Sequence, residues 1–170
     1  RNCSISENTG KGNGVGFWNG PNAVTSLYDC VIAKNSSTGV GAIYNYEITA
    51  GFGTPSLYMV NCEVSGNTNG SFGALYNRDG NAVLVNCTVH GNTAKTGAGV
   101  YCHGANGILT MISSTVTGNT ATTDAGADDD LMVADFVRQN QGENGKAVAL
   151  NFHHTLSKVE FLFTTNVGSD

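Results

Sequence analysis

Cys87 and His90 form the pair of side chains whose types and spacing come nearest to a metal-binding motif. They lie in the stretch VNCTVHGNT, residues 85–93, and thiolate and imidazole groups are common zinc ligands. His153 and His154 are adjacent, so on a strand they would point to opposite faces and could not bind one metal together. A site at Cys87 would need further ligands from another segment of the chain.

Carboxylates are the side chains that could carry acid–base catalysis. A polysaccharide lyase or hydrolase needs a cluster of them, with a base for proton abstraction or a separated acid pair for hydrolysis. The first 123 residues hold five, at unrelated positions: Glu7, Asp29, Glu47, Glu63 and Asp79. The run DDD at 128–130 lacks the glycine and glutamate spacing of a calcium loop. The sequence therefore predicts no catalytic residue, no metal and no other cofactor; Asp79 is expected to form a surface ion pair with Arg78.

A repeated motif positions these residues. Segments resembling VNCTVHGNT recur along the chain, anchored at Cys3, Cys30, Cys62, Cys87 and, with serine in place of cysteine, Ser114. An asparagine follows each anchor by five positions: Asn8, Asn35, Asn67, Asn92 and Asn119. A second motif, seen as GFWN, GAIYN, GALYN and GVYC, lies midway through each copy. Anchors stand 27, 32, 25 and 27 residues apart, so the connection between the second motif and the next anchor varies in length.

The repeat unit predicts short strands that stack on equivalent strands. Around the fourth anchor, one set of alternate residues is Val83, Val85, Cys87 and Val89, and the other is Leu84, Asn86, Thr88 and His90. This two-residue period is typical of a β-strand. Copies this short cannot bury a face alone. We therefore expect an all-β fold, a parallel β-helix (solenoid) of about four to five coils, with the long connection around YEITAGFGTPS on a surface turn.

Stacking turns equivalent residues into columns. The anchors are expected to form an inward ladder of small side chains with free thiols, and the five asparagines a turn ladder whose amides bond from coil to coil. Cys102 lies outside the anchor column, and we expect another free thiol there. His90 corresponds to Ser6, Ala33, Ser65 and Thr117 in the other copies. A metal site at Cys87 and His90 would therefore have no second half in the neighbouring coil.

The aromatic residues of the second motif form a candidate binding strip. If Phe17, Ile43, Leu75 and Val100 face inward, alternation turns the next residue of each motif outward: Trp18, Tyr44, Tyr76 and Tyr101. Exposed rings offer a stacking surface for sugar rings or for partner side chains. The alternative is that the four rings only stack on one another and shield the sheet.

Composition and charge narrow the choice of partners. Only 12% of residues are charged, and the net charge of −5 arises after residue 123, where eight acidic residues face three basic ones. No basic stripe suits nucleic acid, and no apolar run is long enough to span a membrane. The repeat ends near residue 123, which predicts repeats over 1–123, an acidic linker over 124–130 and a separate β segment over 131–170.

The GAIYN and GALYN stretches, together with NCxVxGNT, resemble the repeats of right-handed parallel β-helix proteins of bacterial surfaces, namely polymorphic outer-membrane proteins and related secreted adhesins. A second stretch, over about 129–166, resembles part of the N-terminal lobe of Bacteroidales fimbrillin-like proteins. The matching residues are Asp130, Leu131, Ala134, Val148, Leu150, Phe152, His154, Leu156, Ser157, Lys158, Val159 and Phe161. The segment is expected either to keep that family's structure or to cap the solenoid.

The resemblances imply two classes of function. The first is a non-catalytic structural or adhesive module, secreted or at the bacterial cell surface (outer membrane or fimbriae), with surface glycans or other fimbrial or surface proteins as partners. The second is a fragment of a glycan-binding or polysaccharide-degrading β-helix whose catalytic coils lie outside this chain. Because β-helices host many unrelated activities, residues of a site must decide between the two.

Overall fold

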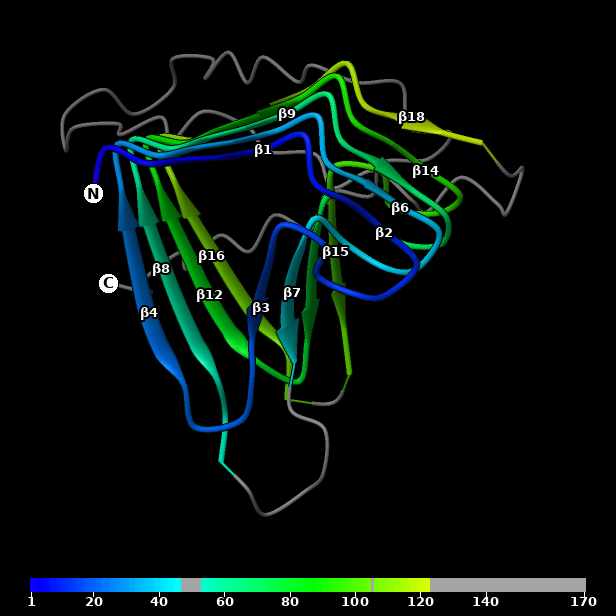
Figure 1. The fold of residues 1–170 in the computed structure, drawn as a ribbon. Coiled ribbons are helices and arrows are strands. Elements are labelled where there is room, and N and C mark those ends of the chain that lie inside the picture. The colour runs from blue at the N-terminus through cyan, green and yellow to red at the C-terminus, as the bar shows by residue number, and fades with distance from the viewer. Residues whose placement is uncertain (47–52, 105, 123–170) are drawn as a thin grey trace, which may run out of the picture.

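Parallel strands stacked coil on coil build the whole described part of the chain. The computed structural model describes residues 1–46, 53–104 and 106–122. The predicted linker and fimbrillin-like segment, the histidines at 153 and 154, the aspartate run at 128–130 and Glu47 lie outside these residues. Each coil contributes up to four short strands, and strands of successive coils lie side by side, as the colour sequence in Figure 1 shows. The predicted all-β parallel solenoid is confirmed.

Two of the four sheets follow the anchor residues. Sheet A contains β1 (Ser4–Ser6), β5 (Val31–Ala33), β9 (Glu63–Ser65), β13 (Thr88–His90) and β17 (Thr115–Thr117). Sheet B contains β2 (Thr9–Gly10), β6 (Ser36–Ser37), β10 (Thr68–Asn69), β14 (Thr93–Ala94) and β18 (Thr120–Ala121). Each strand pairs in parallel with its equivalent in the next coil, so His90 lies opposite Ser65 and Thr117 as predicted.

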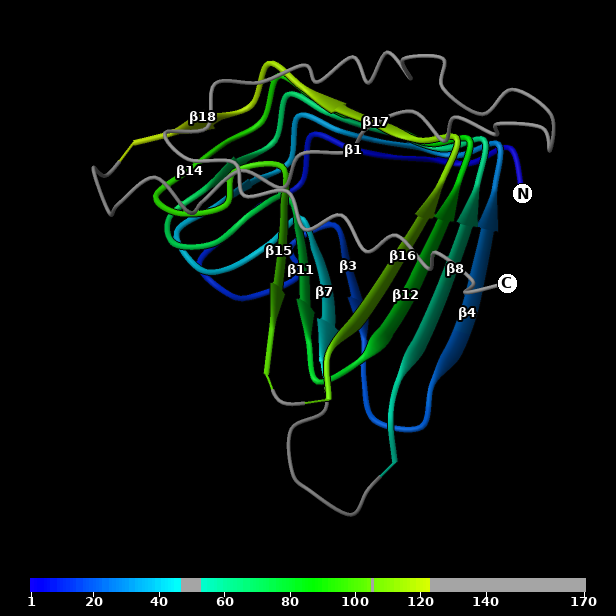
Figure 2. The same cartoon turned by 180° about the vertical axis from the view of Figure 1, so that it is seen from behind.

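The other two sheets follow the second motif and the variable connection. Sheet C contains β3 (Phe17–Asn19), β7 (Ile43–Tyr46), β11 (Leu75–Arg78) and β15 (Val100–His103). Sheet D contains β4 (Val24–Tyr28), β8 (Ser56–Val60), β12 (Asn81–Val85) and β16 (Ile108–Ile112). Sheets A, C and D surround the interior, and sheet B continues sheet A beyond a corner, in both Figure 1 and the reverse view of Figure 2.

Columns of apolar side chains fill the interior. Ile32, Val64 and Val89 are fully buried on sheet A, and Ile43 and Leu75 on sheet C. The residue before each aromatic of the second motif thus faces inward, which was the condition for the proposed strip, with Val100 also buried and Phe17 packed against the core. Because every column repeats one kind of residue, each new coil covers the apolar surface of the coil below it.

The anchor cysteines form the predicted inward column. Cys30, Cys62 and Cys87 are buried, whereas Cys3 in the first coil is exposed, and all five cysteines are free. Each buried thiol donates to the carbonyl two residues earlier, at 3.1 to 3.4 Å. Ser114 keeps this bond through its hydroxyl, which donates to the carbonyl oxygen of Ile112 at 3.0 Å. Because the serine hydroxyl makes the same bond as the cysteine thiol, serine can replace cysteine at this position of the repeat.

A left-handed residue before each anchor turns the chain from sheet D into sheet A. Asp29, Asn61 and Asn86 have φ values of 54°, 52° and 51°, a region that asparagine and aspartate tolerate better than most residues. The turn corrects one prediction. Val83 and Val85 were expected on the same face as Cys87, but the structure buries Ala82 and Leu84 instead. The alternation restarts after the corner, because a strand pattern does not continue through a left-handed residue.

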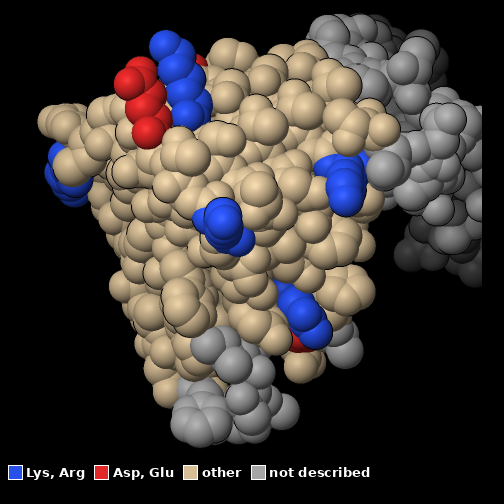
Figure 3. Space-filling view, turned by 45° about the vertical axis from the view of Figure 1, so that its right-hand side comes forward, with Lys and Arg blue, Asp and Glu red and all other residues tan. Residues whose placement is uncertain are grey.

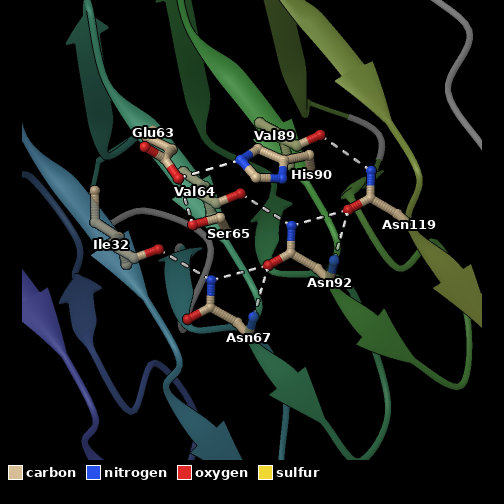
Figure 4. Close-up of polar contacts among 9 residues, drawn as sticks. All are labelled: Ile32, Glu63, Val64, Ser65, Asn67, Val89, His90, Asn92 and Asn119. Carbon is tan, nitrogen blue, oxygen red and sulfur yellow. Dashed lines mark hydrogen bonds and ion pairs between the residues drawn. The ribbon is translucent and has the colours of Figure 1, made fainter.

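The five turn asparagines form the predicted ladder. Asn67 donates from both its side-chain nitrogen and its backbone N–H to Asn92 Oδ1, each at 2.9 Å, and Asn92 donates in the same way to Asn119 Oδ1 (Figure 4). The second hydrogen of the Asn92 amide bonds the carbonyl oxygen of Val64 in the preceding coil at 3.0 Å. Asn35, Asn67 and Asn92 are fully buried, so the ladder supplies partners that water cannot.

A second asparagine ladder, which was not predicted from the sequence, runs along sheet C. Asn19 Nδ2 donates to Asn45 Oδ1 at 2.7 Å, and Asn45 Nδ2 donates to Asn77 Oδ1 at 2.6 Å. Asn77 Nδ2 then donates to the Cys102 sulfur at 3.4 Å, which places this cysteine at an asparagine position of the second column. The signal was present as the asparagine that follows the aromatic residue in WN, YN and YN.

Replacing one rung of the ladder should destabilise the solenoid strongly. Asn92→Ala would leave the backbone N–H of Asn67 without its acceptor and the carbonyl of Val64 without its side-chain donor in a buried site. Oδ1 of Asn119 would lose one of its two donors and keep the backbone N–H of residue 92. Each orphaned group costs about 1–3 kcal/mol, so we expect a loss of at least about 2 kcal/mol in the free energy of unfolding, measured by chemical denaturation. Asn8→Ala, at the exposed end of the same column, should cost about 1 kcal/mol or less. Equal losses in the two variants would contradict this account.

Thiol reactivity should separate the cysteines by their position in the stack. Burial raises the pKa of the Cys62 and Cys87 thiols, and a thiol reacts as its thiolate. In the native protein a thiol reagent should modify only the two exposed cysteines, Cys3 and Cys102, and in denaturant all five. Mass spectrometry of the labelled peptides checks the assignment. Rapid native labelling of Cys62 or Cys87 would show that the anchor column is open to solvent.

Candidate functional site

The predicted aromatic strip is a stacked column along sheet C. Ring centroids of Trp18 and Tyr44 are 6.3 Å apart, those of Tyr44 and Tyr76 5.3 Å, and those of Tyr76 and Tyr101 5.4 Å. Tyr46 stacks on Tyr44 at 4.9 Å. The four predicted residues are therefore brought together, with one ring on each of four successive coils.

Most of this column is covered, contrary to the expectation of an exposed strip. Tyr44 and Tyr76 are only 5% and 3% exposed, whereas Trp18 at the end is 50% exposed. Phe72 lies 4.7 Å from the Tyr101 ring and 5.2 Å from that of Tyr76, so a side chain from the preceding connection packs on the column. The faces of the inner rings are thus already in contact with other rings, and their role in binding sugars stays a prediction.

Glycines in the equivalent connections of other coils allow a close approach to the rings. Gly97 has a φ of 53°, and a Cβ atom there would lie 2.6 Å from Cδ2 of Tyr101. Gly14 occupies a similar place, where a Cβ would lie 3.0 Å from Cβ of Tyr44. Side chains at these positions would separate the connections from the rings. The glycines of the repeat therefore help to form a second apolar cluster outside sheet C.

A hollow on the outer side of sheet A is the second candidate site. It is open to solvent, has a volume of about 600 Å³, and is lined chiefly by side chains from three successive coils. Those with polar groups are Asp29, Asn61, Glu63, Asn86, Thr88 and His90. Two of the five carboxylates of the coils, which in the sequence stand at unrelated positions, therefore share one concave surface.

Glu63 and His90 interact across neighbouring coils in this hollow. His90 Nε2 lies 3.1 Å from Glu63 Oε1, and the Ser65 hydroxyl donates to the same oxygen at 2.7 Å (Figure 4). The hydrogen bonds from Ser65 and His90 lower the pKa of the Glu63 carboxyl, so Glu63 is ionised at neutral pH. No contact between these two residues was predicted, although their offsets from Cys62 and Cys87 already placed them on the outward face of adjacent strands.

The amides at the corner form a short exposed ladder beside this pair. Asn61 Nδ2 donates to Asp29 Oδ1 at 3.0 Å, and Asn86 Nδ2 donates to Asn61 Oδ1 at 2.9 Å.

The predicted ion pair between Arg78 and Asp79 lies outside this hollow, at the end of β11. Arg78 Nε is 3.9 Å from Asp79 Oδ2, as expected for a surface ion pair. Within the described ranges, no three His, Cys, Asp or Glu side chains are arranged to hold a metal ion.

The outward face of sheet D is largely apolar, with a few polar side chains such as Ser56 and Asn81 among the apolar ones. None of its four strands contains a charged residue, and Val24 and Ile108 are 80% and 57% exposed. Val24, Tyr58, Val83 and Ile108 also border a shallow hollow of about 440 Å³. On another side of the molecule, shown in Figure 3, Lys and Arg side chains are present but stand apart from one another. Exposed apolar patches such as that of sheet D often mark contact surfaces.

The stability of the aromatic column should depend on alkaline pH. Burial, aided by the nearby Tyr46 and Tyr76 hydroxyls, raises the pKa of Tyr44 from 10.0 to about 12. Because the folded pKa is above the unfolded value, this contribution to stability is complete below about pH 10 and is lost as the pH rises through about 12. A tyrosinate absorbance titration should show a late step that Tyr44→Phe removes. Titration of all tyrosines near pH 10 would contradict the burial of Tyr44.

Comparisons with known proteins gave no match. Neither a scan against protein-family models nor searches of curated proteins and of solved structures found a similar protein. In the described part of the chain, no helix has the length and apolar character needed to cross a membrane. The likeness to outer-membrane repeats and to fimbrillin-like proteins therefore stays an expectation from the sequence, and function has to be argued from the columns, the hollow and the surfaces described above.

Proposed function

We propose that the chain is a non-catalytic structural or adhesive module of an extracellular or cell-surface protein, in which the solenoid serves as a stalk. The observation that carries the proposal is the pair of continuous asparagine ladders, which bond every coil to the next. A column of bonds parallel to the stack resists separation of the coils. The sequence likeness to bacterial surface repeats and to fimbrillin-like proteins suggests the outer membrane or fimbriae as its location.

The apolar face of sheet D supports the adhesive part of this proposal. Its strands carry no charged side chain, so another surface protein could contact this face without burying an unpaired charge of the strands. Side chains on the outer faces contribute little to the stability of the fold, because the buried ladders and the apolar core lie inside the coils. A stalk of this kind can therefore vary its outer surface while its coils keep their register.

Force spectroscopy would test the structural role. Cys3 and Cys102 are exposed and belong to the first and fourth coils, so handles can be attached to both while the three buried anchor thiols stay protected. A stalk should resist pulling and then release one coil of 25–32 residues at a time. Asn92→Ala should lower the force of the step at its own coil. Unravelling in a single event at low force would contradict the proposal.

Location and activity can be tested separately. Antibodies raised against the full chain should label intact cells of the source organism, and surface proteolysis should remove the signal. Labelling only after the cells are broken open would argue against a surface module. Release of sugar fragments from a panel of polysaccharides by the purified chain would overturn the non-catalytic part of the proposal.

A second candidate function is glycan binding, and the hollow on sheet A favours it. Its volume of about 600 Å³ is in the range of small-molecule sites. Its polar lining suits a hydroxylated ligand better than an apolar one.

A further inference from the structure

The hollow on sheet A is where the repeat departs from its own pattern. Asp29 stands in a corner column that otherwise holds Asn2, Asn61, Asn86 and Ser113. Glu63 stands opposite Thr88 and Val31, and His90 opposite Ser65 and Thr117. The other coils fold without a charged or titratable group at these places. Asp29, Glu63 and His90 are therefore not required by the stacking, yet all three line one concave surface.

The unused hydrogen-bonding groups of this hollow are mainly acceptors. Glu63 receives both of its bonds, from Ser65 and His90, at Oε1. Asp29 receives the Asn61 amide at Oδ1. Among the described residues, the second oxygen of each carboxylate therefore has no donor, and the same holds for Oδ1 of Asn86, whose amide nitrogen bonds Asn61.

These acceptors select a ligand that donates hydrogen bonds and carries positive charge. Neither lysine nor arginine lines the hollow, and Asp29 and Glu63 each contribute a carboxylate to it. An ammonium group forms short, strong bonds to carboxylates, whereas an anionic ligand would be repelled. Thr88 and Asn86 can bond neighbouring hydroxyl groups, and Val31, 38% exposed, offers an apolar contact.

We propose that this hollow binds an amino sugar unit of a glycan, with Asp29 and Glu63 holding its protonated amine and Thr88 and Asn86 its hydroxyl groups. The proposal rests on the second candidate function, glycan binding, and names the sugar class and the residues. It needs no covalent step. It also leaves the stalk role unaffected, because the ligand would contact only outward-facing groups.

Calorimetric titration of the full chain with a β-linked glucosamine oligosaccharide tests the proposal. The N-acetylated oligosaccharide lacks the charge and should bind at least about tenfold more weakly, because charge-assisted bonds are about twice as strong as neutral ones. A short lysine peptide of equal charge should also bind more weakly. Equal affinity for the peptide would show a general attraction of cations and would overturn amino sugar recognition.

The repeat itself supplies variants that should not disturb the fold. Asp29→Asn and Glu63→Thr introduce the residues found at the same positions in neighbouring coils, Asn61 and Thr88. Each should weaken glucosamine oligosaccharide binding by about tenfold, as expected for the loss of one charge-assisted contact. Glu7→Gln removes an equal charge from an exposed residue of another coil and should change the affinity less than about twofold. Circular dichroism of each variant confirms that the solenoid is intact.

The outcomes separate the site from the candidate function. If the oligosaccharide binds equally well to Asp29→Asn, Glu63→Thr and the unaltered chain, glycan binding stands and the hollow is the wrong place. If neither oligosaccharide binds, both the site and the glycan-binding function fail. A shift of the His90 ring signals in NMR spectra on titration gives an independent readout, because His90 borders the hollow beside Glu63.

Discussion

The amide-to-amide hydrogen bond between successive coils is the interaction on which the rest of the structure depends. A buried asparagine amide has two donor hydrogens and an acceptor oxygen, and all of them need partners. In the turn ladder the oxygen of Asn92 receives two donors from the coil below, and its nitrogen serves the coils on both sides. An identical residue one coil away on each side satisfies this geometry. The ladder therefore fixes the register of the parallel strands, and the apolar columns inherit it.

The corners impose the second constraint. Each coil turns at a left-handed residue before the anchor and at another before the ladder asparagine, where Gly66, Gly91 and Gly118 serve the later coils and Glu7 and Lys34 the first two. A residue other than glycine costs about 1–2 kcal/mol in this conformation, which the bonds of the adjacent ladder offset. Where these corners fall determines which residues of the flanking strands face inward.

With register and corners fixed from inside, the outer faces of the coils are free to differ, and function is to be sought there. On sheet C the aromatic residues are packed by Phe72 and the glycine connections, so that face is largely closed. On sheet A one hollow is lined by Asp29, Glu63 and His90, which differ from the residues at the same positions of the other coils. On sheet D the outer side chains remain uncharged and partly exposed. The same stack thus presents three chemically distinct surfaces.

The sequence by itself determined the fold class, the columns and the free thiols, because a repeat places equivalent residues on top of one another whatever the shape of the coil. The inward orientation of Phe17, Ile43, Leu75 and Val100 was only a condition in the sequence argument, and the structure supplied it. The sequence did not determine the inward face of the strand before each anchor, because a left-handed Asn86 interrupts the alternation between Val85 and Cys87. Burial of Tyr44 and Tyr76 was likewise decided in three dimensions, by contacts with Phe72 and with rings on other coils. The hollow is also a tertiary feature, since Asp29, Glu63 and His90 are distant in sequence and meet only because coils of different length bring their corners into one column.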